Sequence, residues 1–174
     1  MRQKMFLLIV LIVGLIAIFS YKMYFLDNPT SEKVPALINQ KVSLTEATDL
    51  FSIEKKVDLL STADNKKIIH IFTTWCGCCK KELPELQKLA ENYKITGLVW
   101  TQNAEEARSW LQSNGNHYEE VGIINDKEAV KLGLYKSPVT LVLDVEGNVQ
   151  CALQGPLTVE KFNDNIALCV VEKR

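Results

Sequence analysis

The segment between residues 67 and 93 constrains the fold most, because it predicts a buried strand that runs directly into a helix. Residues 67–73 form a short apolar, β-branched run, which is typical of a central strand. From about Cys76 onward, apolar residues recur at helical spacing along one face. Pro84 lies inside that pattern, and we expect it to kink the helix. A strand followed by a helix of this kind indicates an α/β domain.

The remainder of the globular region continues the alternation of strands and helices. Gly147 lies between two apolar runs and predicts a hairpin loop. Thr158 can cap a closing helix that extends to about Val170. We expect further strands at residues 95–101, 121–124, 139–143 and 149–153, and further helices at residues 104–113, 126–132 and 158–170. The predicted fold class is therefore α/β, with a central mixed β-sheet flanked by helices.

The N-terminus predicts one transmembrane helix. Residues 5–21 carry no charge, and the apolar run continues to residue 26 if Lys22 extends its ammonium to the membrane surface. Arg2 and Lys4 precede the run, so they should stay in the cytoplasm and place the C-terminal domain outside. We expect a cytoplasmic tip at residues 1–4, a signal anchor at 5–26, a linker at 27–33 and one domain at 34–174.

A cleaved signal peptide is the alternative interpretation of this N-terminus. No clear Ala-x-Ala cleavage pattern precedes Pro29, which favours the uncleaved anchor. Either interpretation places the domain on the oxidising side of a bacterial inner membrane, where disulfides form and persist. Acidic and basic residues nearly cancel, with 21 Asp and Glu against 20 Lys and Arg, so a nucleic-acid partner is not expected.

The candidate catalytic residues are Cys76 and Cys79, which form a Cys-x-x-Cys pair at the predicted strand–helix junction. Residues three apart in a first helical turn lie on one face, so we expect a redox-active Cys76–Cys79 disulfide. The unpaired N–H groups at a helix N-terminus favour a thiolate, which makes Cys76 the expected nucleophile. Cys79, one turn deeper, is expected to resolve the mixed disulfide.

Metal binding is the main alternative for this motif, because zinc sites share its spacing. They need further ligands, and the chain has only two histidines and two distant cysteines. We therefore expect no metal, although copper bound by the cysteines and a histidine stays open. Cys78 is an unusual third thiol. It is either a passenger at a variable position or a group that tunes the potential or rescues mixed disulfides.

The residues around the motif resemble a known family. The stretch from Phe72 to Pro84, including Trp75 and Glu82, looks like a thioredoxin-superfamily active site. The stretch from Lys136 to Thr140 looks like the cis-proline loop that faces it. The resemblance implies a thioredoxin-like fold, a cis bond before Pro138, and a loop including Ser137 that holds the substrate peptide extended.

Within that superfamily, the chain is similar to the periplasmic thiol–disulfide interchange proteins of cytochrome c maturation, the DsbE or CcmG family. The matching stretches are residues 35–38, 107–111, 115–118, 132–135 and 143–148. This resemblance implies a reductase that acts on apocytochrome c or another exported protein and is recharged by a DsbD-type membrane electron donor. It implies no cofactor besides the cysteine pair. A general or copper-stress thioredoxin of the TlpA or ScsD kind, and a copper or apocytochrome carrier, are the alternatives.

Two residues depart from the family pattern. Val139 stands after the proline where the family usually has an acid, and His70 stands six residues before Cys76 where thioredoxins usually have Asp. A polar group at that position can take the proton that Cys79 loses, so His70 is either a proton relay or an ordinary hydrogen-bonded core histidine. Cys151 and Cys169, in the last strand and last helix, can form a structural disulfide, although sequence does not reveal connectivity.

Overall fold

The computed structural model describes residues 2–27, 32–60 and 66–170 of the chain. Its strands are β1 (Glu32–Lys33), β2 (Glu46–Asp49), β3 (Lys56–Asp58), β4 (Lys66–Phe72), β5 (Ile95–Trp100), β6 (Glu120–Ile124), β7 (Val139–Asp144) and β8 (Val149–Gln154). Its helices are α1 (Arg2–Asp27), α2 (Gly77–Lys81), α3 (Leu83–Ala90), α4 (Ala104–Asn114), α5 (Asp126–Lys131), α6 (Val159–Asn165) and α7 (Ala167–Val170), with a 3₁₀ turn η1 (Pro35–Leu37).

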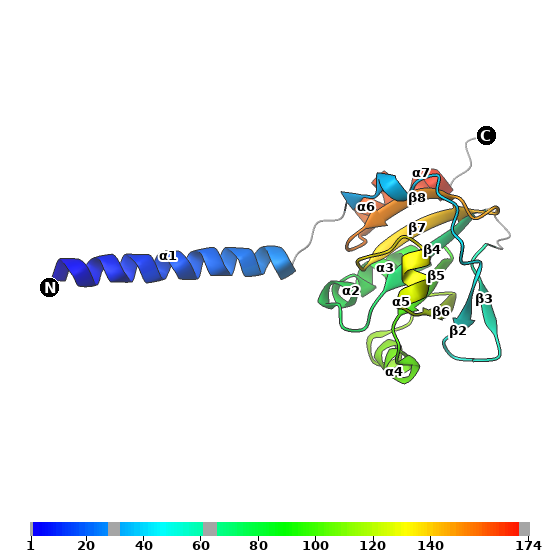
Figure 1. Ribbon diagram of the computed structural model, residues 1–174, viewed down its shortest axis with the longest axis horizontal. Coiled ribbons are helices and arrows are strands. Elements are labelled where there is room, and N and C mark those ends of the chain that lie inside the picture. Colours follow the sequence, from blue (N-terminus) through cyan, green and yellow to red (C-terminus); the bar gives the residue numbers. More distant parts are fainter. Residues whose placement is uncertain (1, 28–31, 61–65, 171–174) are drawn as a thin grey trace.

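Within these described residues, the strands form one mixed, eight-stranded sheet in the order β1-β8-β7-β4-β5-β6-β2-β3 (Figure 1). Strands β4, β5 and β6 run parallel, as strands joined by helical crossovers do. The hairpin strands β7 and β8 are antiparallel, and β7 pairs antiparallel with β4 at the centre of the sheet. The predicted thioredoxin-like α/β fold is confirmed.

The sheet separates two apolar clusters, and strand β4 contributes to both. Ile68 and Phe72 belong to the cluster that also contains buried residues of α3, α4 and α6. Ile69 and Ile71 belong to the cluster that contains buried residues of α5 and η1. Because side chains alternate along a strand, His70 lies on the same face as Ile68 and Phe72. The strand pattern alone therefore places His70 on the side of the sheet where the cysteine-bearing helix packs.

Helix boundaries follow the local sequence. The predicted kink before Pro84 is present, since α2 ends at Lys81, Glu82 intervenes, and Pro84 occupies the first turn of α3. Thr158 caps α6 by accepting a hydrogen bond from the backbone N–H of Lys161. The single closing helix predicted for residues 158–170 is wrong, because it breaks into α6 and α7 at Ile166.

Strand pairing extends to residues just before the predicted start of the domain. Residues 28–31 of the expected linker lie outside the described residues, as do residues 171–174 at the C-terminus. Glu32 and Lys33 form strand β1 and pair with Gln154 and Leu153 of β8. This pairing uses backbone groups, so no apolar pattern in the sequence predicts it.

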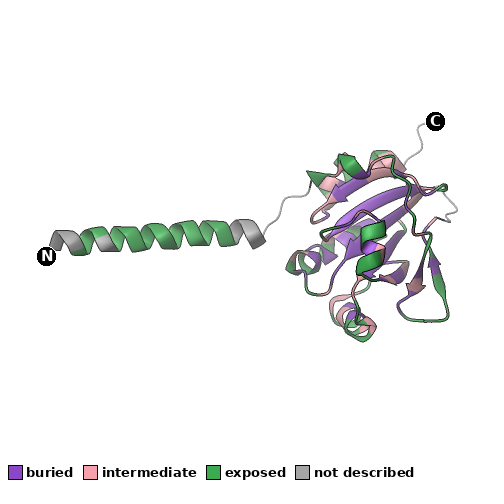
Figure 2. Ribbon diagram, in the orientation of Figure 1, coloured by how far each residue is buried: buried purple, intermediate pink, exposed green. Residues whose placement is uncertain are grey.

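Helix α1 has the properties expected of a membrane span. Its stretch from Met5 to Met23 has a mean hydropathy of 2.5, and it is long and apolar enough to cross a bilayer. The side chains described in this stretch are exposed along the helix, which Figure 2 shows apart from the sheet. The predicted anchor at residues 5–26 falls inside this helix.

Candidate active site

The three clustered cysteines lie at the junction between strand β4 and helix α2. Strand β4 ends at Phe72, a short turn follows, and Cys76 is the N-cap residue of α2. Its Sγ accepts a hydrogen bond from the backbone N–H of Cys79 at 3.3 Å, which satisfies one of the free donors of the first turn. Cys76 and Cys79 are buried, whereas Cys78 is half-buried. The predicted location of Cys76 at a helix N-terminus is confirmed.

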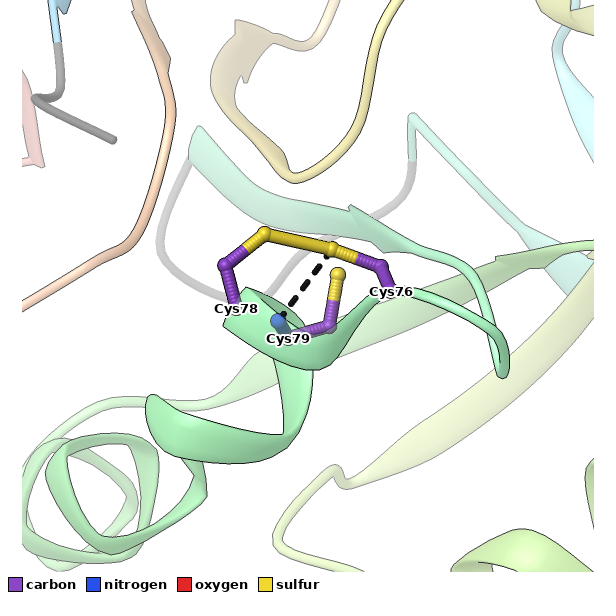
Figure 3. A group of neighbouring side chains, drawn as sticks. All are labelled: Cys76, Cys78 and Cys79. Atoms are coloured by element: carbon purple, nitrogen blue, oxygen red, sulfur yellow. Dashed lines mark hydrogen bonds between the residues drawn. A yellow bond between two sulfur atoms is a disulfide. The ribbon is translucent and has the colours of Figure 1, made fainter. Parts of the chain in front are cut away.

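The disulfide connectivity differs from the expected Cys76–Cys79 pair. The structure joins Cys76 to Cys78 and leaves Cys79 as a free, buried thiol (Figure 3). A Cys76–Cys79 pair is expected from helical spacing only if Cys76 is itself helical, but Cys76 has extended backbone (φ −81°, ψ 111°). Cys78 is therefore also within reach, with its Cα 5.4 Å from that of Cys76, inside the usual range for a disulfide. All three Sγ atoms lie within 4.8 Å of one another, so either helical cysteine can reach Cys76.

The environment of Cys79 opposes its ionisation. Burial raises the pKa of the Cys79 thiol from an ordinary 9.0 to about 12, and the nearby Glu82 carboxylate contributes to the rise. Hydrogen bonds from the backbone of Thr73 and the side chain of Ser137 lower the pKa, but by less. Cys79 is consequently a protonated thiol at neutral pH, and it has to lose its proton before it attacks a disulfide.

A buried polar network lies next to Cys79. His70 Nδ1 is 2.9 Å from the Tyr118 hydroxyl, and His70 Nε2 is 3.3 Å from Glu82 Oε1. The other carboxylate oxygen of Glu82 accepts a hydrogen bond from the backbone N–H of Leu157 at 2.8 Å. Burial, together with the charges of Glu82 and Cys79, raises the pKa of Tyr118 well above its ordinary value. His70 thus lies against the side chains of Tyr118 and Glu82, and the charge of Glu82 raises the pKa of Cys79.

Tyr118 is the site residue that sequence reasoning missed. Strand pairing places Gly97 of β5 next to His70. A Cβ atom on Gly97 would lie 2.8 Å from Tyr118 Cγ, so the tyrosine ring packs on this strand only because residue 97 lacks a side chain. Tyr118 also stacks on Phe72, with ring centroids 5.2 Å apart. A glycine in the middle of an apolar central strand was the available signal, since it indicates a close approach by another group.

The loop before strand β7 faces the cysteines. Its Ser137–Pro138 peptide bond is cis, as the resemblance implied. The Ser137 hydroxyl lies 3.1 Å from the Thr73 hydroxyl, which ties the loop to the end of β4. Val139, which stands where an acid was expected, is buried in β7 opposite Ile71. Glu82 is accordingly the described carboxylate whose charge raises the pKa of Cys79.

Two aromatic side chains project from the surface around this site. Trp75, directly before Cys76, and Tyr135, on the cis-proline loop side, are each 79% exposed. A cavity of about 220 Å³ is lined by residues that include Trp75 and Thr73. A second cavity of about 390 Å³ is lined by residues that include Tyr135 and Lys136. Exposed aromatic rings beside hollows of this size are typical of surfaces that contact a polypeptide.

The three thiols are also the described group whose ligand atoms converge closely enough for a metal ion. Soft thiolates suit Cu(I), so the donor set fits such an ion. The group contains no histidine, and the ring nitrogens of His70 face Glu82 and Tyr118. The alternative of a copper site completed by His70 is therefore not supported by the geometry.

The second cysteine pair lies away from this site. Cys151 of β8 is joined to Cys169 of α7, with Cα atoms 6.1 Å apart. This is the pairing that the sequence allowed without deciding. The disulfide ties α7 to strand β8, so of the cysteines Cys79 alone is a free thiol in the described part of the chain.

Comparison with known proteins agrees with the geometry. The family model described as Redoxin matches residues 30–166. The thiol:disulfide interchange protein DsbE of Pasteurella multocida is 30% identical over 165 residues, covering 90% of this chain and 90% of its own length. The protein of the same name from Pseudomonas aeruginosa is 29% identical over 174 residues, covering 96% of this chain and 93% of its own.

Solved structures show the same fold at lower identity. A secreted thiol-disulfide isomerase from Corynebacterium glutamicum superposes with a TM-score of 0.66 at 18% identity, covering 82% of this chain and 92% of its own. A DsbF homologue from Corynebacterium diphtheriae superposes with a TM-score of 0.60 at 21% identity, covering 78% of this chain and 90% of its own. These two likenesses concern the fold alone.

Proposed function

The chain belongs to the Redoxin family, and we propose that it is a membrane-anchored reductase of disulfides in exported proteins. Its relatives and its cysteine cluster make it a thiol–disulfide oxidoreductase. The observation that carries the proposal is the position of Cys76 at the start of α2, beside the Ser137–Pro138 loop and within reach of two further thiols. Cys76 is 7% exposed and Cys79 1%, so an incoming disulfide reaches Cys76 more readily than Cys79.

The proposed reaction is a two-electron exchange. The Cys76 thiolate attacks one sulfur of the substrate disulfide, and the other substrate sulfur leaves as a thiolate. A second thiol of the site then attacks Cys76 Sγ and releases the substrate as a dithiol. Trp75 and the cis-proline loop would contact the extended substrate, and Glu82 with His70 would receive the proton that Cys79 loses.

The proposed direction of electron flow, from this chain to its substrate, rests on the resemblance to the DsbE family. A strongly oxidising enzyme is one whose reduced form is stabilised, as happens when a thiolate is favoured. A measured reduction potential near about −120 mV, the value of a dedicated disulfide-forming enzyme, would overturn the reductase assignment.

The proposed substrate is apocytochrome c, or another exported protein with a reducible cysteine pair, and the proposed electron donor is a DsbD-type membrane protein. The resemblance to the DsbE family supports this pathway, as do relatives of that name along nearly the whole chain. The second candidate is a TlpA- or ScsD-like exported thioredoxin linked to copper stress, which the three converging thiols favour.

Trapping decides between these substrates. Full-length Cys78→Ser/Cys79→Ser protein keeps Cys76 as its only active-site thiol and should hold substrates as mixed disulfides, which mass spectrometry identifies. The same double variant with Cys76→Ser added is the matched control. Recovery of haem-protein precursors or their maturation partners supports the pathway. Recovery of only unrelated exported proteins would favour the general thioredoxin.

Membrane anchoring by helix α1 is the second part of the proposal. Its support is the apolar stretch from Met5 to Met23. We expect the full chain to stay in the membrane pellet after carbonate extraction, and its domain to be digested by protease added outside the inner membrane. A soluble protein whose N-terminus begins beyond this stretch would instead indicate a cleaved signal peptide.

A further inference from the structure

The active site holds one thiol more than disulfide exchange requires. Cys76 Sγ is bonded to Cys78 Sγ, while the free thiol of Cys79 lies within 4.8 Å of both (Figure 3). We propose that Cys78 is a second catalytic thiol, which resolves the mixed disulfide on Cys76 first and then passes the bond to Cys79. This inference rests on the proposed exchange function, in which Cys76 is the nucleophile.

The two thiols that can resolve the mixed disulfide, Cys78 and Cys79, differ in solvent exposure. Cys78 is half-buried and reaches solvent, whereas Cys79, in the first turn of α2, is 1% exposed and faces the core. A thiol that reaches solvent ionises far more readily than one enclosed by apolar groups and facing a carboxylate. The thiolate is the attacking species, so Cys78 is available at neutral pH when Cys79 is still protonated.

Geometry allows both attacks on the same sulfur. As the N-cap residue, Cys76 has extended backbone, and its Sγ points back over the first turn of the helix. The Cα atoms of Cys76 and Cys78 are 5.4 Å apart, close enough for a disulfide without movement of the chain. Neither attack requires a rearrangement of α2, and Cys76 Sγ is the common centre of both disulfides.

The steps balance in atoms and electrons. The Cys78 thiolate attacks Cys76 Sγ, the bond from Cys76 to the substrate sulfur breaks, and the substrate leaves as a thiolate that takes a proton from water. The substrate has then gained two electrons, and the protein has lost two. In the second step Cys79 gives its proton to Glu82 with His70, attacks Cys76 Sγ and displaces Cys78, whose thiolate takes a proton from water. This step is an exchange with no net oxidation.

The size of the advantage follows from the two protonation equilibria. At about pH 7.5, a thiol of pKa about 12 is ionised to roughly one part in 30,000, against roughly one part in 30 for a thiol at the ordinary 9.0. The more basic thiolate is intrinsically the better nucleophile, by roughly 15- to 30-fold over this range. The net advantage of an accessible thiol is therefore tens of fold.

The test mixes the full-length chain, with its active-site cysteines reduced, and a stoichiometric amount of a nitrobenzoate disulfide. Each nitrobenzoate thiolate that is released absorbs visible light. The first release of thiolate marks the mixed disulfide on Cys76, and the second marks its resolution. Cys79→Ser protein should give the second release and yield a Cys76–Cys78 disulfide in peptide maps. Cys78→Ser protein should resolve more than about tenfold more slowly than the parent near pH 7.5.

Two results would overturn the inference. Cys79→Ser protein that stops after the first release, or Cys78→Ser protein that resolves as fast as the parent, would show that Cys79 acts alone. Either result leaves the proposed function standing. Full substrate reduction by Cys76→Ser protein would show that Cys76 is not the nucleophile, and parent protein that releases no thiolate would refute the proposed function. Acid quenching of the parent chain during the reaction, followed by peptide mapping, avoids any effect of the substitutions on folding. The first protein disulfide to form should be Cys76–Cys78, and an initial Cys76–Cys79 disulfide would contradict the relay.

Discussion

Replacing Glu82 by glutamine tests the electrostatic account of the buried thiol. The substitution removes the charge that raises the pKa of Cys79 but keeps an oxygen that can accept the hydrogen bond from Leu157 N–H. The amide can also donate to His70 Nε2 if the ring proton moves to Nδ1 and is donated to Tyr118. The variant therefore changes charge while keeping the shape of the network.

The expected magnitude follows from the position of the pKa. With a pKa of about 12, roughly one Cys79 in 10,000 is ionised at about pH 8, against roughly one in ten for a thiol at the ordinary 9.0. A neighbouring charge shifts a pKa by about 1–3 units. Glu82→Gln should therefore increase the Cys79 thiolate population at about pH 8 by roughly tenfold or more, while burial keeps the pKa above 9.0.

Alkylation by iodoacetamide measures this population. In a Cys76→Ser/Cys78→Ser background, the alkylation rate of Cys79 should rise about tenfold per pH unit up to about pH 11. The Glu82→Gln profile should be displaced to lower pH. Glu85→Gln is the matched control, since that carboxylate binds Lys88 and the Val159 N–H and does not act on Cys79. Identical profiles for Glu82→Gln and the control would refute the electrostatic account.

Three further predictions concern the surroundings of the site. His70→Ala should lower the exchange rate and alter its profile between about pH 5 and 8, if the imidazole relays the proton; an unchanged profile would remove the relay. Gly97→Ala should destabilise the domain by about 1–3 kcal/mol in urea unfolding, because its Cβ meets the tyrosine ring at 2.8 Å, whereas Gly77→Ala, with nothing within 4 Å, should not. Replacing both cysteines of the β8–α7 disulfide by serine should cost about 3 kcal/mol of unfolding free energy, given a sequence separation of 18 residues. A loss below about 1 kcal/mol would indicate that the helix is held by packing alone.

Apolar periodicity predicted the central strand β4 and helix α4, but it did not predict the short strands β1, β2 and β3. Strand β4 and helix α4 follow patterns that a single segment displays, since each buries its own apolar face. Strands β1, β2 and β3 are short and contain charged residues at Glu32, Lys33, Glu46, Asp49, Lys56 and Asp58. Their pairing depends on backbone groups of distant strands, such as β6 for β2, and side-chain patterns do not report it.

The site was predictable to the extent that its chemistry is local. Cys76 lies four residues after the end of β4, so a strand–helix pattern was enough to place it at the helix N-terminus. Tyr118 lies 48 residues from His70 and reaches it only through the packing of β5 beside β4. The Cys76–Cys78 disulfide was not predicted, for a different reason. The dihedral angles of an N-cap residue cannot be inferred from helical spacing.

Glu82 has both a structural role at the junction of two helices and an electrostatic effect on Cys79. It separates α2 from α3, and its two carboxylate oxygens face His70 and the backbone N–H of Leu157. Val139 supplies no charge, so Glu82 is the described carboxylate that adds to the effect of burial in raising the pKa of Cys79. Cys78 is half-buried and less enclosed than Cys79. Two resolving thiols with different proton requirements would let exchange at Cys76 proceed at pH values where the buried thiol alone is too slow.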